Sequence, residues 1–500
     1  MRFTRRSFLL GASSAAFAPS VAWADDKERF NPRSIAVGDV GARQATFWCR
    51  ARRDGRMRLQ IAENPEFSNP RELWGPFTGA DSDFTARTRV DELPLNTRLY
   101  WRAMVDHWGV PSEWMVGSFR TAGPDRDVRF AWGGDTGGQG YGIDDTRGGM
   151  RIFEAIRTHK PDFLIHCGDL AYADQPFKKR VTLHDGQTWH NVVTPETGKV
   201  SETLPELRGR FRYNHIDDNF RNMLTEVPVL HMWDDHEVYN NFWPGKPIHD
   251  IRYRATNTNQ IIGPAKRAFF EYTPIDGDRI WRNVKYGPLL EVFLLDTRSE
   301  RAANSENHQK TYGPDCHWLG PAQCEWLKTG LKDSTSLWKV IACDMPLGIR
   351  SGGAKKGSDN ASNGDGVPLG RELEIADILS FMKQNGVRNV VWLTADLHYA
   401  TCTRYHPDEA VFKDFDPFWE FMAGPLNAGT GMHHPLDDTF GAKTEWISIP
   451  EDLPRHAPPT DGYQFYGIVE ISSATREFTV RFFNADAKEL HSMVLPAEGA

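Results

Sequence analysis

A carboxylate and a phenol stand three residues apart in the stretch 168–174, which reads Gly-Asp-Leu-Ala-Tyr-Ala-Asp. Asp169 follows a short apolar run, residues 163–167, that is typical of a buried strand. Open α/β sheets bind their ligands beyond the carboxyl ends of such strands. In that place Asp169 can bridge two metal ions, and Tyr172 can offer a phenolate to one of them. A Gly-Asp turn followed by a packed tyrosine explains this stretch equally well.

Other apolar runs of the chain also end in an aspartate, and two of them add a histidine. These endings are Asp135, Asp234-Asp235-His236-Glu237, Asp296-Thr297-Arg298, Asp344 and Asp396-Leu397-His398. If the strand ends meet at one edge of a sheet, the carboxylates repel one another strongly unless cations neutralise them. We therefore predict bound metal ions. The alternative is a set of unrelated, solvated loop carboxylates.

The elements that position these residues follow an α/β pattern. Residues 128–135 read as a strand, a helix runs to about Thr158, and residues 163–167 form the next strand, which together make a βαβ unit. Further strands are predicted at 227–233, 289–295, 337–342 and 390–393, with a helix near 217–225 and a polar, aromatic insertion at 177–213. Residues 465–471 and 478–482 predict a closing hairpin.

The region before this pattern has a different rhythm. From residue 30 to 122 the sequence shows short alternating runs broken by turn residues, which predicts a small β-sandwich resembling fibronectin-type modules. Residues 123–125 read as a linker, and we assign residues 126–490 to the catalytic domain. No cluster of chemical groups stands out in the β-sandwich, so we expect it to serve packing or to border the substrate.

The first 24 residues read as an export signal. Arg5 and Arg6 precede a short apolar stretch and an Ala-Trp-Ala cleavage site ending at Ala24, a pattern that resembles the twin-arginine signal. The apolar stretch is shorter than the roughly 20 residues that a membrane span needs, so we expect no transmembrane anchor. We expect the twin-arginine machinery as a partner and a periplasmic or secreted protein.

Composition narrows the remaining classes. The 500 residues carry a net charge of −8 with no basic block, which argues against nucleic-acid binding. The six cysteines allow fifteen full pairings, and only Cys316 and Cys324 lie close together in the sequence. The sequence does not choose among these pairings.

The order of Asp135, Gly168-Asp169, Asp235-His236 and Asp396-Leu397-His398 resembles the calcineurin-like metallophosphoesterase superfamily. Residues 233–237 (Trp-Asp-Asp-His-Glu) and 295–298 (Leu-Asp-Thr-Arg) are typical of its PhoD-like alkaline phosphatase family. The resemblance covers nearly the whole mature chain. It implies the α/β fold of that superfamily, a β-sandwich flanked by helices, preceded here by the small all-β domain.

The same resemblance implies two metal sites that share Asp169. The first would be formed by Asp135, Asp169, Tyr172 and His398, and the second by Asp169, Asp235, Asp344 and Asp396. The first set is hard and anionic and suits Fe³⁺, whereas an all-oxygen second set favours Ca²⁺, Mg²⁺ or Mn²⁺ over Zn²⁺. An iron and calcium pair fits both. The first motif, Asp135-Thr136-Gly137, also resembles purple acid phosphatases, which use Asn and His where this chain has Asp235, Asp344 and Asp396.

Two adjacent metals of this kind hydrolyse phosphate esters by direct attack of a metal-bound hydroxide. His236 is then a candidate proton donor to the leaving group, or alternatively only orients Asp235. Arg298 is a candidate fork for phosphate, with an ion pair to the acidic edge as its alternative. Asn240 and Asn241 are weaker candidates for substrate binding. Asp174, Asp234 and Asp296 are expected to surround the ligands. His433 and His434 lie in a Gly-rich loop and could line the cleft, although a loop histidine pair is more often solvated.

The predicted function is that of an exported phosphomonoesterase or phosphodiesterase acting on a small molecule or a polymer. A phospholipase D-type or teichoic-acid phosphodiesterase is the second hypothesis, because pocket shape decides the substrate. A non-catalytic exported binding protein is the third. It is disfavoured because a purely structural site has no need of two adjacent metals with open positions.

Overall fold

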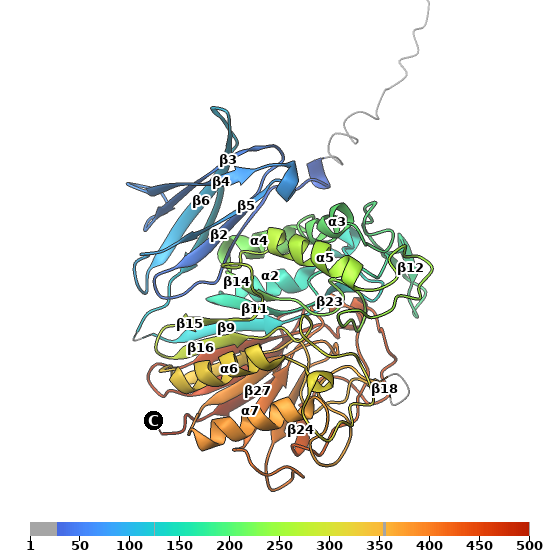
Figure 1. Cartoon of the computed structure of the whole chain (residues 1–500). Coiled ribbons are helices and arrows are strands. Elements are labelled where there is room, and N and C mark those ends of the chain that lie inside the picture. The colour runs from blue at the N-terminus through green and yellow to red at the C-terminus, as the bar shows by residue number, and fades with distance from the viewer. Residues whose placement is uncertain (1–27, 125, 354–356, 500) are drawn as a thin grey trace, which may run out of the picture.

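The computed structural model describes residues 28–499 except 125 and 354–356 (Figure 1). The signal-peptide prediction, residues 1–24, lies outside this range. Within it, no helix is long and apolar enough to cross a membrane.

Two mixed β-sheets form the centre of the molecule. The six-stranded sheet contains, in spatial order, β14 (Val229–Met232), β11 (Phe163–Cys167), β9 (Val128–Gly133), β25 (Phe465–Ile471), β26 (Phe478–Asn484) and β27 (Glu489–Leu495). The seven-stranded sheet contains β15 (Arg282–Tyr286), β16 (Leu290–Leu294), β17 (Trp338–Ala342), β20 (Val390–Thr394), β22 (Phe418–Met422), β21 (Thr401–Tyr405) and β24 (Ala442–Ile447).

The two sheets pack face to face, and successive side chains of each strand enter different apolar layers. In β11, Phe163 and Ile165 belong to the core between the sheets, whereas Leu164 packs beneath helices. In β17, Val340 faces the same central core and Ile341 faces the helices on the far side. Because both faces of these strands are covered, they read as continuous apolar runs.

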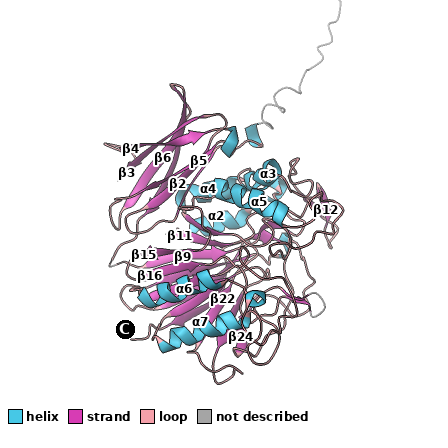
Figure 2. Cartoon of the chain, viewed as in Figure 1, coloured by secondary structure: helices cyan, strands magenta, loops and turns pink. Residues whose placement is uncertain are grey.

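Helices cover both outer faces. The six-stranded sheet carries α2 (Arg151–Thr158), α3 (Leu204–Asn214), α4 (Asp218–Glu226) and α5 (Asn259–Tyr272), and the seven-stranded sheet carries α6 (Pro321–Asp333) and α7 (Glu372–Gln384). Figure 2 shows the resulting layers of helix, sheet, sheet and helix. The predicted α/β sandwich flanked by helices is confirmed.

The strand ends lie in two groups rather than along one sheet. β9, β11 and β14 are mutually parallel in one sheet, and β16, β17 and β20 are parallel in the other. The aspartates that follow these strands therefore approach one another across the sandwich. The sequence predicted that the strand ends meet at one edge of a single sheet, because a strand's own residues do not indicate which sheet it joins.

The N-terminal region consists of strands, as predicted. One sheet contains β1 (Ser34–Gly38), β2 (Ala45–Arg50) and β5 (Thr85–Val90), and the other contains β4 (Arg71–Thr78), β3 (Gly55–Ala62), β6 (Arg98–His107), β7 (Val110–Pro111) and β8 (Met115–Arg120). Their inward residues, such as Phe47 and Trp101, join the core that also contains the strands of the central sandwich. Figure 1 shows this region in blue beside α4 and α5.

Short elements complete the fold. β10 (Thr136–Gly138) pairs with β23 (Asn427–Ala428), β12 (Arg180–Thr182) pairs with β13 (Thr188–His190), and β18 (Gly352–Gly353) pairs with β19 (Gly357–Ser358). α3 lies largely in the stretch predicted only as an insertion. Its signal is present, because Thr203 and Glu206 form a capping box in front of it. All six cysteines are free thiols, including Cys316 and Cys324.

Candidate metal centre

Strand ends deliver the predicted ligands in an unusual backbone conformation. Asp135, Asp169, Asp396 and His398 have φ angles of 69°, 53°, 67° and 60°. Residues with a side chain rarely adopt this left-handed region, and holding one there costs about 1–3 kcal/mol. Four such residues at the ends of three strands indicate that the turns are shaped for what their side chains hold.

The first predicted site is brought together in the structure. The ligand atoms of Asp135, Asp169 and His398 all lie within 4.8 Å of one another, and all three residues are buried. The hydroxyl of Tyr172 lies 3.0 Å from Nε2 of His398. These are the four residues that the sequence assigned to this site.

His398 presents the nitrogen that a metal needs. Its Nδ1 lies 2.5 Å from the carbonyl oxygen of Gly429, so Nδ1 carries the proton and donates it there. Burial lowers the pKa of His398 to about 3, which keeps the ring neutral. Nε2 therefore offers a lone pair toward Tyr172 and toward Asp135, whose Oδ1 lies 3.7 Å away. A neutral imidazole fixed through its other nitrogen is a typical metal ligand.

Tyr172 is held tightly in place. Its ring stacks on His236, with centroids 4.4 Å apart and planes inclined by 28°. On its other side lies Gly138, where a Cβ atom would collide with the tyrosine ring. Burial, followed by the charges of Asp169 and Asp135, raises the pKa of Tyr172 well above its ordinary value. The phenol therefore ionises only if a cation is beside it.

A second cluster of ligand atoms adjoins the first. Asp169, Asp235 and His236 form one close group, and Asp234, Asp235 and Asp396 form another. Asp169 thus belongs to clusters on both sides, which is the position of a bridging carboxylate. Glu237 fixes this arrangement, because its carboxylate accepts the backbone N–H groups of Leu170 (2.6 Å) and Asp234 (2.9 Å).

Several of these carboxylate oxygens are buried without a hydrogen-bond donor. They are both oxygens of Asp135, Oδ1 of Asp235 and Oδ2 of Asp234. Burial is the largest cause that raises the pKa of Asp135, Asp169 and Asp396 well above its ordinary value, and neighbouring carboxylates add to it. Buried oxygens of this kind are costly unless a partner satisfies them. The donor set, mostly oxygen with one imidazole, fits hard cations such as Fe³⁺ and Ca²⁺.

Asp344, which the family resemblance assigns to the second site, is not in these close groups of described residues, and its role as a ligand stays a prediction. One of its oxygens accepts the hydroxyl of Thr297 at 2.5 Å, and Nε of Arg298 lies 3.4 Å away. The turn after β17 points this carboxylate toward those partners. Asp234, expected only to surround the ligands, contributes an oxygen to the second cluster instead.

Arg298 has the second of its two predicted roles. The guanidinium is fully buried and pairs with Asp234 at 2.6 Å and with Asp359 at 3.1 Å. It does not line the cleft described below. The structure therefore favours the ion pair over a fork for phosphate, because the donors of Arg298 are already used.

His236 pairs with an acid that the sequence placed only in the surroundings. Its Nδ1 lies 2.7 Å from Oδ1 of Asp174, whose other oxygen accepts the backbone N–H of Asn240 at 2.9 Å. Burial alone would lower the pKa of His236, but the charges of Asp174, Asp235 and Asp169 raise it well above its ordinary value. Asp174 therefore holds the ring of His236 and favours its protonated form.

These groups open into a cleft of about 540 Å³. Asn240 and Asn241 line it, as do His434 and the floor residues Asp169, Asp235, His236, Asp396 and His398. The backbone N–H of Asn241 donates to Asp235, and Lys246 donates to the carbonyl oxygens of both asparagines. His433 points elsewhere, with Nε2 3.0 Å from the carbonyl oxygen of Ile449.

Some residues of the cleft were not foreseen from the sequence. They are Gln139, Ser351, Thr430, Met432, Arg455 and His456. Gln139 and Ser351 follow Asp135 and Asp344 by four and seven residues, whereas the others lie on loops far from the strand-end motifs in the sequence. No periodicity or spacing signals that such loops fold back over the site.

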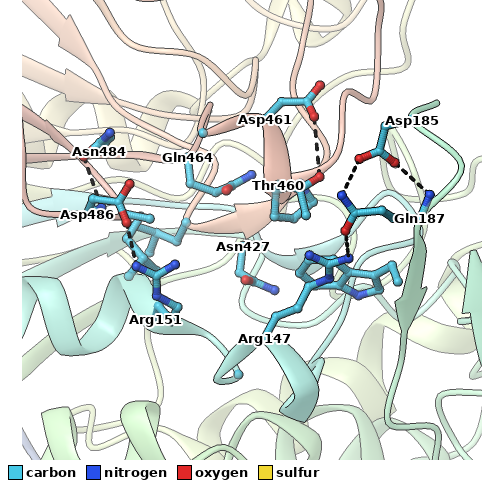
Figure 3. Close-up of a pocket in the computed structure, with 17 residues that line it drawn as sticks. Arg147, Arg151, Asp185, Gln187, Asn427, Thr460, Asp461, Gln464, Asn484 and Asp486 are labelled. Carbon is cyan, nitrogen blue, oxygen red and sulfur yellow. Dashed lines mark hydrogen bonds and ion pairs between the residues drawn. The ribbon is translucent and has the colours of Figure 1, made fainter. Parts of the chain in front are cut away.

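A second recess lies apart from this cleft (Figure 3). Its charged side chains are paired locally: Arg151 lies 2.5 Å from Asp486, and Arg147 donates to Gln187 at 2.9 Å. None of the residues predicted for the site lines it. The chemistry is therefore concentrated in the first cleft.

Comparisons with known proteins agree with the sequence pattern. Residues 130–482 match the model of the PhoD-like phosphatase family, and residues 16–123 match that family's N-terminal domain. Alkaline phosphatase D of Bacillus subtilis (strain 168) is 27% identical over 274 residues, which cover 51% of this chain and 44% of that protein. The chain thus aligns with less than half the length of that relative.

Solved structures share the fold. A structure of PhoD superposes with a TM-score of 0.67 at 18% identity, covering 93% of each chain. The purple acid phosphatase PPD1 from yellow lupin (Lupinus luteus) seeds gives a TM-score of 0.59 at 13% identity, covering 93% of this chain and 74% of that one. At these identities the likeness concerns the fold alone.

Proposed function

The chain belongs to the PhoD-like phosphatase family, and on that basis we propose that it is an exported two-metal phosphoesterase that hydrolyses phosphate mono- or diesters. The observation that carries the proposal is the pair of adjoining ligand clusters that share Asp169 at the floor of one cleft. Residues 1–24 would direct export through the twin-arginine pathway to the periplasm or the medium, residues 30–122 would form the N-terminal domain, and residues 126–490 the catalytic domain.

We assign the ligands as follows. Asp135, Asp169, Tyr172 and His398 would hold Fe³⁺. Asp169, Asp235, Asp344 and Asp396, with Asp234 as an added candidate, would hold Ca²⁺, Mg²⁺ or Mn²⁺. When bound, two such cations polarise phosphate oxygens and lower the pKa of water to near neutrality. The buried carboxylates without donors are the reason the site calls for cations.

The chain's own residues would then orient and protonate the substrate. His236 lies beside Asp235 at the cleft, with Nε2 3.8 Å from that carboxylate, and the charge of Asp174 favours its protonated form. It is placed to donate a proton to the departing oxygen. Asn240 and Asn241 line the same wall and offer amide groups to the ester. Arg298 would act at a distance, by holding Asp234.

Turnover of 4-nitrophenyl phosphate and bis(4-nitrophenyl) phosphate by the purified protein, loaded with iron and calcium, tests the proposal. We expect hydrolysis of at least one ester. Asp486→Asn is the matched control, because Asp486 lies in the second recess. A metal-replete sample that hydrolyses neither ester refutes the proposed function.

A further inference from the structure

The cleft is lined by one arginine, Arg455, that belongs to neither ligand cluster. Arg455 lines the same cleft as the predicted metal ligands, on the loop that follows β24. Among the cleft-lining residues that the structure describes it is the only lysine or arginine, whereas Asp169, Asp235 and Asp396 are acids. Arg455 is exposed. The ion pairs of the described residues do not include it, although acids such as Asp235 line the same cleft.

The loop that carries Arg455 is tied to the site by backbone hydrogen bonds. His456 N–H donates to Thr430 at 2.7 Å, and Thr430 N–H donates to Ala457 at 3.1 Å. The next residue, Gly431, donates its N–H to the carbonyl oxygen of His398 at 2.9 Å. The main chain of Arg455 is thus anchored to the segment that orients a predicted ligand, while its guanidinium remains available.

The two imidazoles near Arg455, those of His434 and His456, are neutral at neutral pH. Burial, aided by the charge of Arg455, lowers the pKa of His434 to about 4. The pKa of His456 is lowered by the same two causes. At neutral pH the positive charge of this wall therefore comes from Arg455.

We propose that Arg455 recognises a second anionic group of the substrate, a phosphate or carboxylate carried beside the ester that is cleaved. The inference rests on the proposed function, since the scissile phosphate must reach the buried floor near Asp169. Arg455, exposed at the mouth, meets what extends from that phosphate. A planar guanidinium binds carboxylate or phosphate through two parallel hydrogen bonds, which suits such a contact.

The test compares two ester substrates that differ by one carboxylate, phenyl phosphate and 3-carboxyphenyl phosphate, or the corresponding diesters. For each protein, kcat/KM for the carboxylated ester is divided by kcat/KM for the plain ester. Comparing this ratio between Arg455→Met and the wild type cancels the intrinsic reactivities of the two esters. We expect the ratio to fall about tenfold, as for loss of a charge-assisted hydrogen bond. Turnover of the plain ester should stay within about twofold, and Arg455→Lys should retain part of the preference.

Arg151→Met is the matched control, because it removes an exposed arginine of the second recess and leaves the cleft intact. An unchanged ratio in Arg455→Met overturns the inference while the proposed function stands. Equal loss on both esters also overturns it, since Arg455 would then contact the scissile phosphate. Calorimetry gives the ratio of the dissociation constants of the two esters without turnover. The inference can therefore be tested even if the protein hydrolyses neither ester.

Discussion

Asp174→Asn should separate proton donation by His236 from a merely structural role. Asp174 accepts His236 Nδ1–H at 2.7 Å, and both side chains are buried. An asparagine can keep this hydrogen bond but removes the negative charge, which is the largest cause that raises the pKa of His236 against burial. The pKa of the imidazole should therefore fall in the variant, so that a smaller fraction of it carries the proton at neutral pH.

The loss should depend on the leaving group. General acid catalysis contributes roughly 10²–10⁴-fold, so we expect about a 100-fold drop, or about 2.7 kcal/mol, for an alkyl phosphate. 4-Nitrophenolate departs without protonation, and its ester should lose less than about threefold. Rates on both esters, with metal content measured alongside, provide the assay.

Asp486→Asn again serves as the control, since it removes one surface carboxylate outside the cleft. Equal losses on the two esters would refute the reasoning and leave His236 as a residue that orients Asp235. Loss of metal from Asp174→Asn would refute it in another way, because His236 would then be a ligand.

Two further predictions concern stability. Arg298→Met leaves Asp234 and Asp359 buried without their cation. The free energy of unfolding in urea should fall by about 3–5 kcal/mol. Wild-type stability together with a raised KM would instead support a phosphate-binding role for Arg298. Burial raises the pKa of Glu420 to about 7, so the folded chain binds a proton that the unfolded chain releases between about pH 4.5 and 7. This proton should contribute a fall in stability of about 3 kcal/mol as pH rises through that window. Glu420→Gln should therefore reduce the slope of stability against pH by that amount, and an unchanged slope would contradict the prediction.

The strands and their acidic ends were predictable from the sequence for a simple reason. Covered on both faces, the strands read as apolar runs, and the next residues, such as Asp135 and Asp169, stand at the carboxyl ends by chain order alone. The sequence thus predicted which residues are near the site. It placed them on one sheet edge, whereas the structure divides the strands between two sheets.

Side-chain direction was not predictable in the same way. Asp344 and Asp234 both follow strands. The turn after β17 directs an oxygen of Asp344 toward Thr297, whereas the turn after β14 gives Asp234 an oxygen in the second cluster. Arg298 was ambiguous between two partners that lie far away in the chain. Arg455 gave no signal at all, because its place depends on backbone hydrogen bonds between two loops.

Metal content tests the central claim most directly. The account predicts two metal ions per chain, one of them iron, in protein purified after export by its native host, and loss of both in Asp169→Asn because that carboxylate belongs to both clusters. Elemental analysis of wild type, Asp169→Asn and the control Asp486→Asn decides the question. Retention of two metals by Asp169→Asn, or a wild-type protein that hydrolyses phosphate esters without metal, would contradict it.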